Sequence, residues 1–246
     1  MTTAPDDHAT TDTARRPLDA VLLAGGRATR LGGASKPEQT VGGRTLLDLA
    51  IDAARRAGAR SIVVVGPSSL TAPGCLVVRE DPPFGGPVAA IAAALGALAA
   101  LDGLNRSRSE ASRDQRTPHD PDPDPDADAD VLVLACDLPQ APAAAERLLA
   151  HRAGAPDGVC LVDADGRTQW LTAIYARRAL DRAFAELDRE PDGAAMRHLV
   201  ASLELGEIAD DGTAEDVDTW PDLDRARERA DIRTSESPAP EARSTT

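Results

Sequence analysis

The residues best suited to chemistry lie in one stretch near the start of the chain, which reads L-L-A-G-G-R-A-T-R-L-G-G-A-S-K-P over residues 22–37. The apolar run before it predicts a buried parallel strand that ends at Leu23. Because glycine turns at positive φ and lets a ligand approach the backbone closely, Gly25 and Gly26 are suited to present free N–H groups there. Arg30 and Lys36 add two cations. The stretch therefore predicts a loop that binds phosphate.

The spacing excludes the two commonest phosphate-binding loops. A P-loop places its lysine between a glycine and Ser or Thr, whereas Lys36 follows Ser35 and precedes Pro37. The dinucleotide fingerprint G-x-G-x-x-G fails because Ala28 stands in place of its second glycine. Lys36 is also the only lysine among the 27 Lys and Arg residues of the chain. A compact ammonium in a tight phosphate pocket would explain this exception, and a surface lysine at a turn is the alternative.

The pattern that fits, L-A-G-G-x-x-x-R-x-G-x-x-K, resembles the signature of nucleotidyltransferases with a glycosyltransferase-A-like fold. Its form A-G-G-R-x-x-R-L-G-G-x-x-K is most similar to that of the molybdenum cofactor guanylyltransferases. The resemblance covers roughly residues 19–101 and 131–231. It implies a Mg²⁺-dependent enzyme whose nucleotide-binding residues here are Leu23, Ala24, Gly25, Gly26 and Lys36. It also implies that Arg30 and Lys36 are catalytic, because they would neutralise charge on the phosphates.

Asp137 is the second feature with chemical potential. It follows the apolar run V-L-V-L-A and Cys136, so a buried strand would bring it to the same sheet edge as the glycine loop. A carboxylate that faces phosphates needs a cation between them, and Mg²⁺ is the usual one. The resemblance likewise implies that Asp137 is catalytic, binds the metal and contacts the nucleotide. A helix N-cap or a turn is the alternative role.

Four other positions carry roles implied by the resemblance. Asp81, in E-D-P-P-F-G-G-P, would contact the nucleotide, although alone this segment is only a turn before a helix. Gly66 would contact the base through its backbone, where relatives often carry a side chain, and this departure weakens the case for guanine. Asp218, in D-V-D-T-W-P-D-L, would be a second metal ligand or a helix cap. Arg197 would bind the acceptor's phosphate or be an ordinary surface arginine.

The charge of the chain is concentrated in three segments. The formal net charge is −14, of which residues 1–19 carry −2, residues 102–130 carry −5 and residues 210–246 carry −6. The remaining body is nearly neutral, so we expect no nucleic acid as partner. We also expect no membrane, since the N-terminus lacks an apolar leader and no run reaches about 18 apolar residues. Three cysteines without metal-ligand spacing fit reduced thiols in a cytoplasmic protein.

Alternating apolar strands and helices predict an α/β fold. We expect a single Rossmann-like three-layer domain with a mostly parallel central sheet, which the resemblance assigns to the nucleotide-diphospho-sugar transferase type. The domain should span residues 18–233, between disordered tails at 1–17 and 234–246, with a disordered acidic insert at 102–130. Strands are expected at 20–23, 61–65, 76–78, 131–135, 158–162, 171–175 and 205–208. Helices are expected at 45–57, 88–101, 143–151, 177–187 and 193–203, with a C-terminal helix capped by Thr219.

The function that these observations favour is Mg²⁺-dependent nucleotidyl transfer. The resemblance favours GTP as the nucleoside triphosphate and molybdopterin as the phosphorylated acceptor, with GMP transferred and pyrophosphate released. Transfer of CMP to molybdopterin, or of a nucleotide to phospholactate or a sugar phosphate, is the alternative reaction. A non-catalytic nucleotide-binding regulatory protein is an alternative of another class, and the presence of both Lys36 and Asp137 argues against it. The sequence predicts no oligomeric state.

Overall fold

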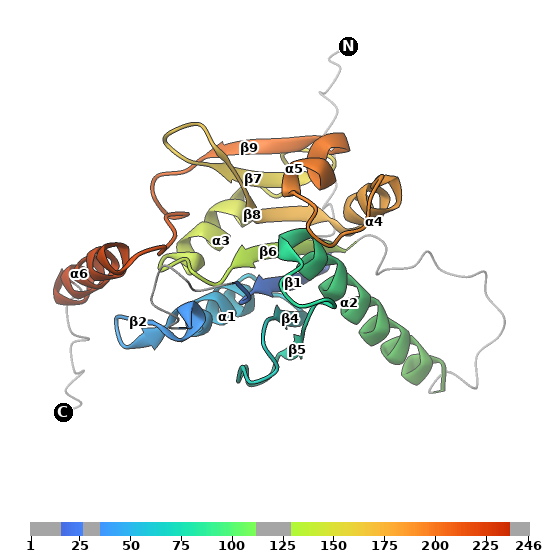
Figure 1. Ribbon diagram of the computed structural model, residues 1–246, viewed down its shortest axis with the longest axis horizontal. Helices are drawn as coiled ribbons and strands as arrows, with labels where there is room; N and C mark the ends of the chain where they lie inside the picture. Colours follow the sequence, from blue (N-terminus) through green and yellow to red (C-terminus); the bar gives the residue numbers. More distant parts are fainter. Residues whose placement is uncertain (1–15, 27–34, 112–128, 237–246) are drawn as a thin grey trace, which may run out of the picture.

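The central layer of the fold is a seven-stranded sheet in the order β5-β4-β1-β6-β8-β7-β9 (Figure 1). The structure is a computed structural model that describes residues 16–26, 35–111 and 129–236. The strands are β1 (Leu18–Leu23), β4 (Ser61–Val65), β5 (Leu76–Val78), β6 (Asp130–Ala135), β7 (Gly158–Val162), β8 (Thr168–Ala176) and β9 (Leu205–Ala209). Of these, β8 alone runs antiparallel to its neighbours. The predicted single α/β domain with a mostly parallel sheet is confirmed.

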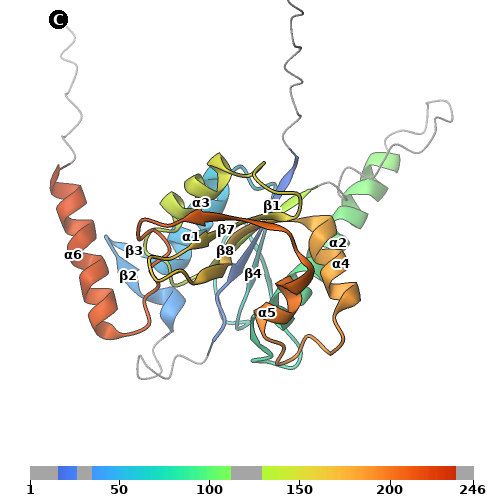
Figure 2. The same ribbon diagram turned by 90° about the horizontal axis from the view of Figure 1, so that it is seen from above.

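Helices cover both faces of the sheet (Figures 1 and 2). They are α1 (Leu46–Arg56), α2 (Gly86–Ala111), α3 (Ala141–Ala150), α4 (Arg177–Glu186) and α5 (Met196–Leu199). One face packs with α1 and α3 and contains Leu22, whereas the other packs with α2, α4 and α5 and contains Val21. Successive residues of a strand point to opposite faces, which is why these neighbours lie in different clusters.

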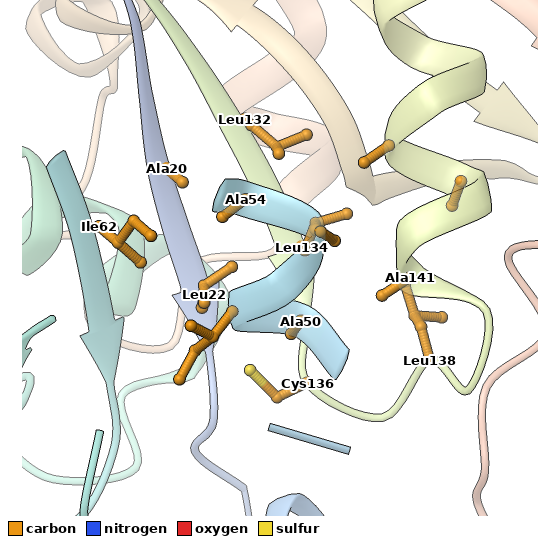
Figure 3. Packing of buried hydrophobic residues seen from close by; sticks show 14 of the residues in the cluster. Ala20, Leu22, Ala50, Ala54, Ile62, Leu132, Leu134, Cys136, Leu138 and Ala141 are labelled. Carbon is orange, nitrogen blue, oxygen red and sulfur yellow. The ribbon is translucent and has the colours of Figure 1, made fainter. Parts of the chain in front are cut away.

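Small side chains let the helices approach the sheet closely. Figure 3 shows Ala20 and Leu22 of β1 in one cluster with Ala50 and Ala54 of α1, and all four residues are fully buried. Only 2% of the chain is aromatic. The core is accordingly built mainly from Ala, Val, Leu and Ile.

The helix α2 is longer than the sequence predicted. It continues past residue 101 to Ala111, so the first part of the expected disordered insert at 102–130 is helical. The other end of that range also belongs to the fold, because β6 begins at Asp130. Directly after the predicted end, Asp102 is 8% exposed and lies 3.7 Å from the Arg60 guanidinium, so this residue packs against the fold. Residues 112–128 lie outside the described residues.

By length and composition, Gly86–Ser107 could cross a membrane, with a mean hydropathy of 1.8. The apolar side chains of this helix are also explained by burial against the sheet. Val88, Ile91, Ala94 and Leu98 are fully buried and belong to the cluster that α2 forms with the sheet.

The last predicted helix before β9 is shorter in the structure than the sequence predicted. The helix expected at 193–203 consists of α5 followed by a 3₁₀ turn, η3 (Val200–Ser202). The residues before α5 form a loop, in which the Gly193 N–H donates to the Gly85 carbonyl at 2.8 Å. A short hairpin, β2 (Thr40–Val41) and β3 (Arg44–Thr45), precedes α1 and has Gly42 at its tip. The C-terminal helix α6 (Trp220–Glu236) lies beside that hairpin in both views (Figures 1 and 2).

The order of the strands creates a crevice at the end of β1. The chain passes from β1 through α1 to β4 on one side, and later returns through α2 to β6 on the other side. Loops that leave such a reversal point diverge, which opens a ligand site at the carboxyl edge of the sheet. Leu23 and Ala135 are register partners at the ends of β1 and β6. The residues that follow these two strands therefore emerge side by side.

The start of β7 has no room for a side chain. Gly158 has a φ of +137°, and a Cβ there would lie 2.2 Å from the Ile174 carbonyl oxygen. We expect Gly158→Ala to lower the free energy of unfolding by about 2–4 kcal/mol, because the two strands would have to separate locally. Gly103→Ala in α2 is the control, since nothing lies within 4 Å of its Cβ position. Chemical denaturation measures both proteins, and equal effects would contradict this account of β7.

Candidate active site

The glycine loop leaves β1 at the crevice. The Ala24 N–H donates to the Val65 carbonyl at 2.8 Å, which continues the pairing with β4 for one residue. Gly26 then has a φ of +139°, a conformation that L side chains rarely adopt. On the other side of β1, the Cys136 N–H donates to the Leu23 carbonyl at 3.0 Å. Asp137 therefore emerges directly beside the glycine loop.

Three carboxylates converge at this point. Asp137, Asp216 and Asp218 each offer one oxygen, and these oxygens all lie within 4.8 Å of one another. Asp216 and Asp218 lie in the segment that precedes α6. This segment is attached to Asp137, because the Val217 N–H donates to the Asp137 carbonyl at 2.9 Å. Val217 is 1% exposed. Its burial fixes the carboxylates on either side of it.

Lys36 supplies the positive charge among these carboxylates. It begins the 3₁₀ turn η2 (Lys36–Glu38), and Pro37 within that turn is buried. Its Nζ lies 3.4 Å from Asp137 Oδ2 and donates a hydrogen bond to Asp218 Oδ1. The side chains of Lys36 and Asp137 are each only 22% exposed. Water screens such a pair less than it screens a fully exposed one, so the attraction is stronger than that of an ordinary surface ion pair.

The electrostatics of the cluster favour a further cation. Burial raises the pKa of Asp137, and the charge of Lys36 only partly offsets this effect. Burial also opposes the charge of Lys36, but the hydrogen bond to Asp218 and the charges of both carboxylates outweigh it and raise the pKa of Lys36. Asp137 Oδ1 is buried without a hydrogen-bond partner among the described residues. Carboxylate oxygens are the preferred ligands of Mg²⁺ and Mn²⁺, so this donor set fits a divalent cation.

A pocket of about 340 Å³ opens beside the cluster. It shares Asp137 with the cluster, and most of its remaining wall is apolar. Its lining residues are Leu23, Gly25, Gly26, Val65, Glu80, Phe84, Gly86, Pro87, Ala90, Ala135, Asp137 and Leu171. Four of the residues predicted to bind nucleotide are therefore brought to one pocket, and a fifth, Ala24, is buried within the same loop.

The structure does not bring the remaining predicted residues to this pocket. The Gly66 N–H is already engaged by the Val78 carbonyl at 2.9 Å, and a Cβ on Gly66 would lie 3.3 Å from Ala24 Cβ. Its lack of a side chain thus lets Gly66 pack against Ala24 of the glycine loop, and contact between its backbone and a base stays a prediction. Asp81 and Arg197 are exposed and belong to neither the pocket lining nor the carboxylate cluster. Arg30 lies outside the described residues.

Sequence reasoning missed two residues of the site. Asp216 could have been found from the pattern D-V-D, because alternate residues of an extended segment point to the same side. Glu80 lines the pocket where the neighbouring Asp81 was expected. No signal in the sequence distinguishes these two adjacent carboxylates, since their placement depends on how the turn packs.

Comparison with known proteins identifies the family. Residues 20–207 match the family model of the MobA-like NTP transferase domain, which is more than half of the chain. The chain belongs to the MobA-like NTP transferase family. Over 83 residues, this MobA-like NTP transferase is 41% identical to the molybdenum cofactor guanylyltransferase of Nitrobacter hamburgensis. That match covers 32% of this chain and 39% of the relative, so the chain spans about two fifths of the length of this curated relative.

Solved structures agree with the fold of this MobA-like NTP transferase. The Mycobacterium tuberculosis protein Rv0371c, solved in complex with manganese, has a TM-score of 0.55 at 23% identity, with 87% of this chain and 98% of that chain covered. Molybdopterin-guanine dinucleotide biosynthesis protein A from Archaeoglobus fulgidus gives 0.53 at 19% identity, covering 87% and 99%. 2-C-methyl-D-erythritol 4-phosphate cytidylyltransferase from Thermus thermophilus gives 0.54 at 21% identity, also covering 87% and 99%. The resemblance to this nucleotidyltransferase fold is thereby confirmed.

Lys36→Met tests whether the ammonium is the counter-charge of the carboxylates. Methionine keeps the length of the side chain and removes its charge, so we expect the metal-free variant to lose about 1–3 kcal/mol of unfolding free energy. Added Mg²⁺ or Mn²⁺ should then raise the thermal midpoint of the variant more than that of the wild type, because it replaces the missing charge. Arg56→Met removes an exposed ion pair with Asp52 and serves as the control. An equal metal response in Lys36→Met and the wild type would contradict this role.

Proposed function

We propose that this chain is a nucleotidyltransferase that depends on a divalent cation, transfers GMP from GTP to molybdopterin and releases pyrophosphate. The observation that carries the proposal is the position of Asp137, which belongs both to the pocket with the glycine loop and to the carboxylate cluster with Lys36. A nucleotide in the pocket would thus have its phosphates beside the cluster. Membership of the family supports nucleotidyl transfer, and the partial match to a guanylyltransferase supports the choice of GTP and molybdopterin.

The chemistry needs positioning and charge neutralisation. A phosphate oxygen of the acceptor attacks the α-phosphorus in line, a new P–O bond forms, and the bond to the departing pyrophosphate breaks. The acceptor phosphate is already ionised, so no general base and no covalent intermediate are required. The Gly25 and Gly26 backbones would hold the phosphates, and Lys36 would neutralise charge that develops during transfer.

A divalent cation would be held by Asp137, Asp216 and Asp218. When bound, such an ion neutralises phosphate charge and orients the triphosphate. We propose Mg²⁺ as the physiological ion, because it combines carboxylates with substrate phosphates in its ordinary binding mode. A relative of the same fold was solved with manganese, which has the same preference for oxygen ligands.

A cytoplasmic location fits this reaction. All three cysteines, Cys75, Cys136 and Cys160, are unpaired, and two of them are buried. Reduced thiols are typical of the compartment that holds nucleoside triphosphates.

The decisive experiment measures pyrophosphate release by the purified full chain. Each of the four nucleoside triphosphates is supplied with Mg²⁺ and molybdopterin, and we expect release with GTP alone. Omission of the acceptor or addition of EDTA should abolish it. Release with CTP would reassign the enzyme as a cytidylyltransferase, and release with another phosphorylated acceptor would reassign the acceptor. Nucleotide binding without release under any of these conditions would favour a regulatory protein.

The carboxylates should differ in their importance for turnover. We expect Asp137→Asn to lower kcat/KM by at least about 100-fold, because an amide is a weaker ligand for a hard cation and Asp137 also lines the pocket. Asp218→Asn should lower kcat/KM by less than about tenfold, because its side chain is 38% exposed.

Asp211→Asn is the matched control, since this 62% exposed carboxylate pairs with Arg147 away from the cluster. Rates are measured as a function of Mg²⁺ concentration, and the fold is checked by thermal unfolding. An Asp137→Asn protein with the Mg²⁺ dependence of the wild type would show that this residue holds no metal.

A further inference from the structure

One rim of the pocket is formed by the turn from Glu80 to Phe84, which the proposed chemistry does not use. Both end residues line the pocket. They are tied together, because the Phe84 N–H donates to Glu80 Oε1 at 3.0 Å. The carboxylate and the aromatic ring therefore form one unit, which we call the Glu80–Phe84 rim.

Phe84 has an unusual conformation for a bulky residue. Its φ is +69°, and it is the only residue besides glycines with a positive φ in the described part of the chain. The ring is 54% exposed, with the Arg79 guanidinium 5.6 Å from its centroid. Backbone strain of this kind persists where the surroundings enforce it, and it concentrates at functional sites.

Contacts with a second segment of the chain fix the backbone conformation after Phe84. The Gly193 N–H donates to the Gly85 carbonyl at 2.8 Å. A Cβ on Gly85 would lie 2.7 Å from Asp192 Oδ1 and 2.9 Å from Ala89 Cβ. The rim is thus held in place by the loop before α5 and by the first turn of α2, and it can present a fixed shape to a ligand.

The charge of Glu80 sets which part of a nucleotide can lie beside it. Glu80 follows β5, whereas Asp137 follows β6, and these two strands are three strand intervals apart in the sheet, or about 14 Å. No Lys or Arg is among the described residues that line this pocket. A phosphate beside Glu80 would be repelled by its carboxylate, whereas Arg79 lies over the Phe84 ring and is not among the described residues that line the pocket. The phosphates belong at the Lys36 end, and the rim takes the uncharged base.

A carboxylate selects among bases because it only accepts hydrogen bonds. Guanine presents N1–H and the N2 amino group side by side, so two donors can reach one carboxylate. Adenine and cytosine each place an acceptor nitrogen beside their amino group, and uracil has one N–H between two carbonyls. An exposed ring at the same rim can cover the face of the base, a contact that tolerates any base. The ring therefore adds affinity, and the carboxylate adds selectivity.

We infer that Glu80 is the specificity-determining residue of this site and selects guanine nucleotides through N1–H and the N2 amino group. Phe84 covers the base, and its N–H positions the carboxylate. This inference rests on the proposed function and deepens it, because it assigns the base to a particular side chain. It also assigns the nucleotide contact to Glu80 instead of Asp81, because Asp81 is exposed and outside the pocket lining.

The test measures the binding of GTP and of ITP to the full chain by calorimetry, with Mg²⁺ present and no acceptor. ITP keeps N1–H and lacks the N2 amino group, so it loses one of the two hydrogen bonds. We expect the wild type to bind GTP about 10- to 100-fold more tightly than ITP, the range for a hydrogen bond to a charged group. Glu80→Gln should reduce that ratio to within about threefold, because its amide offers one acceptor and can still bind the Phe84 N–H.

Two further variants separate the possible outcomes. Glu146→Gln alters an exposed carboxylate on α3, on the opposite face of the sheet, and should keep the GTP-to-ITP ratio of the wild type. Asp81→Asn should also keep it, and loss of the ratio in Asp81→Asn with retention in Glu80→Gln would overturn the inference in favour of Asp81. A wild type that binds GTP without preference over ITP would overturn the inference and leave nucleotidyl transfer standing. A wild type that binds no triphosphate would overturn the proposed function itself.

Discussion

Repulsion among three carboxylates is the constraint on which the site depends. Asp137, Asp216 and Asp218 bring their oxygens within 4.8 Å of one another, and like charges at this distance are unfavourable unless a cation lies among them. Lys36 supplies that cation from a segment far away in the sequence. The cluster therefore joins the turn at η2, the end of β6 and the segment before α6 into one electrostatic unit. Its remaining negative charge is what makes a divalent cation favourable there.

The sheet makes this convergence possible through its strand order. β1 lies between β4 and β6, and its end is level with both neighbours, since Leu23 is the register partner of Val65 and of Ala135. The glycine loop and Asp137 thus emerge at one edge without any special local sequence. Fully buried parallel strands cannot slip by one residue without exposing part of the core, because alternate side chains fill opposite faces. The geometry of the site is therefore as firm as the core beneath it.

The sequence predicted those parts of the molecule that depend on local pattern. Continuous apolar runs mark buried parallel strands well, and Ser61–Val65, Leu76–Val78 and Gly158–Val162 are strands with the predicted bounds. Features that depend on tertiary contact were missed. The helix α2 runs past its predicted end at residue 101, where Asp102 pairs with Arg60, a residue distant in the sequence. The roles of neighbouring carboxylates were equally unpredictable, because only packing decides that Glu80 and not Asp81 lines the pocket.

The two ends of the site differ in their charge toward a phosphate group. At one end Lys36 and the cluster, once it holds a cation, attract phosphate, and at the other end the carboxylate of Glu80 repels it. Between them, the described residues that line the pocket are uncharged and mostly apolar. A triphosphate that entered backwards would set phosphate against Glu80 and leave the cluster without its counter-ligand. In the proposed reaction, this asymmetry of charge determines which end of the substrate reaches the reacting groups, and the shape of the pocket has only to accept the base.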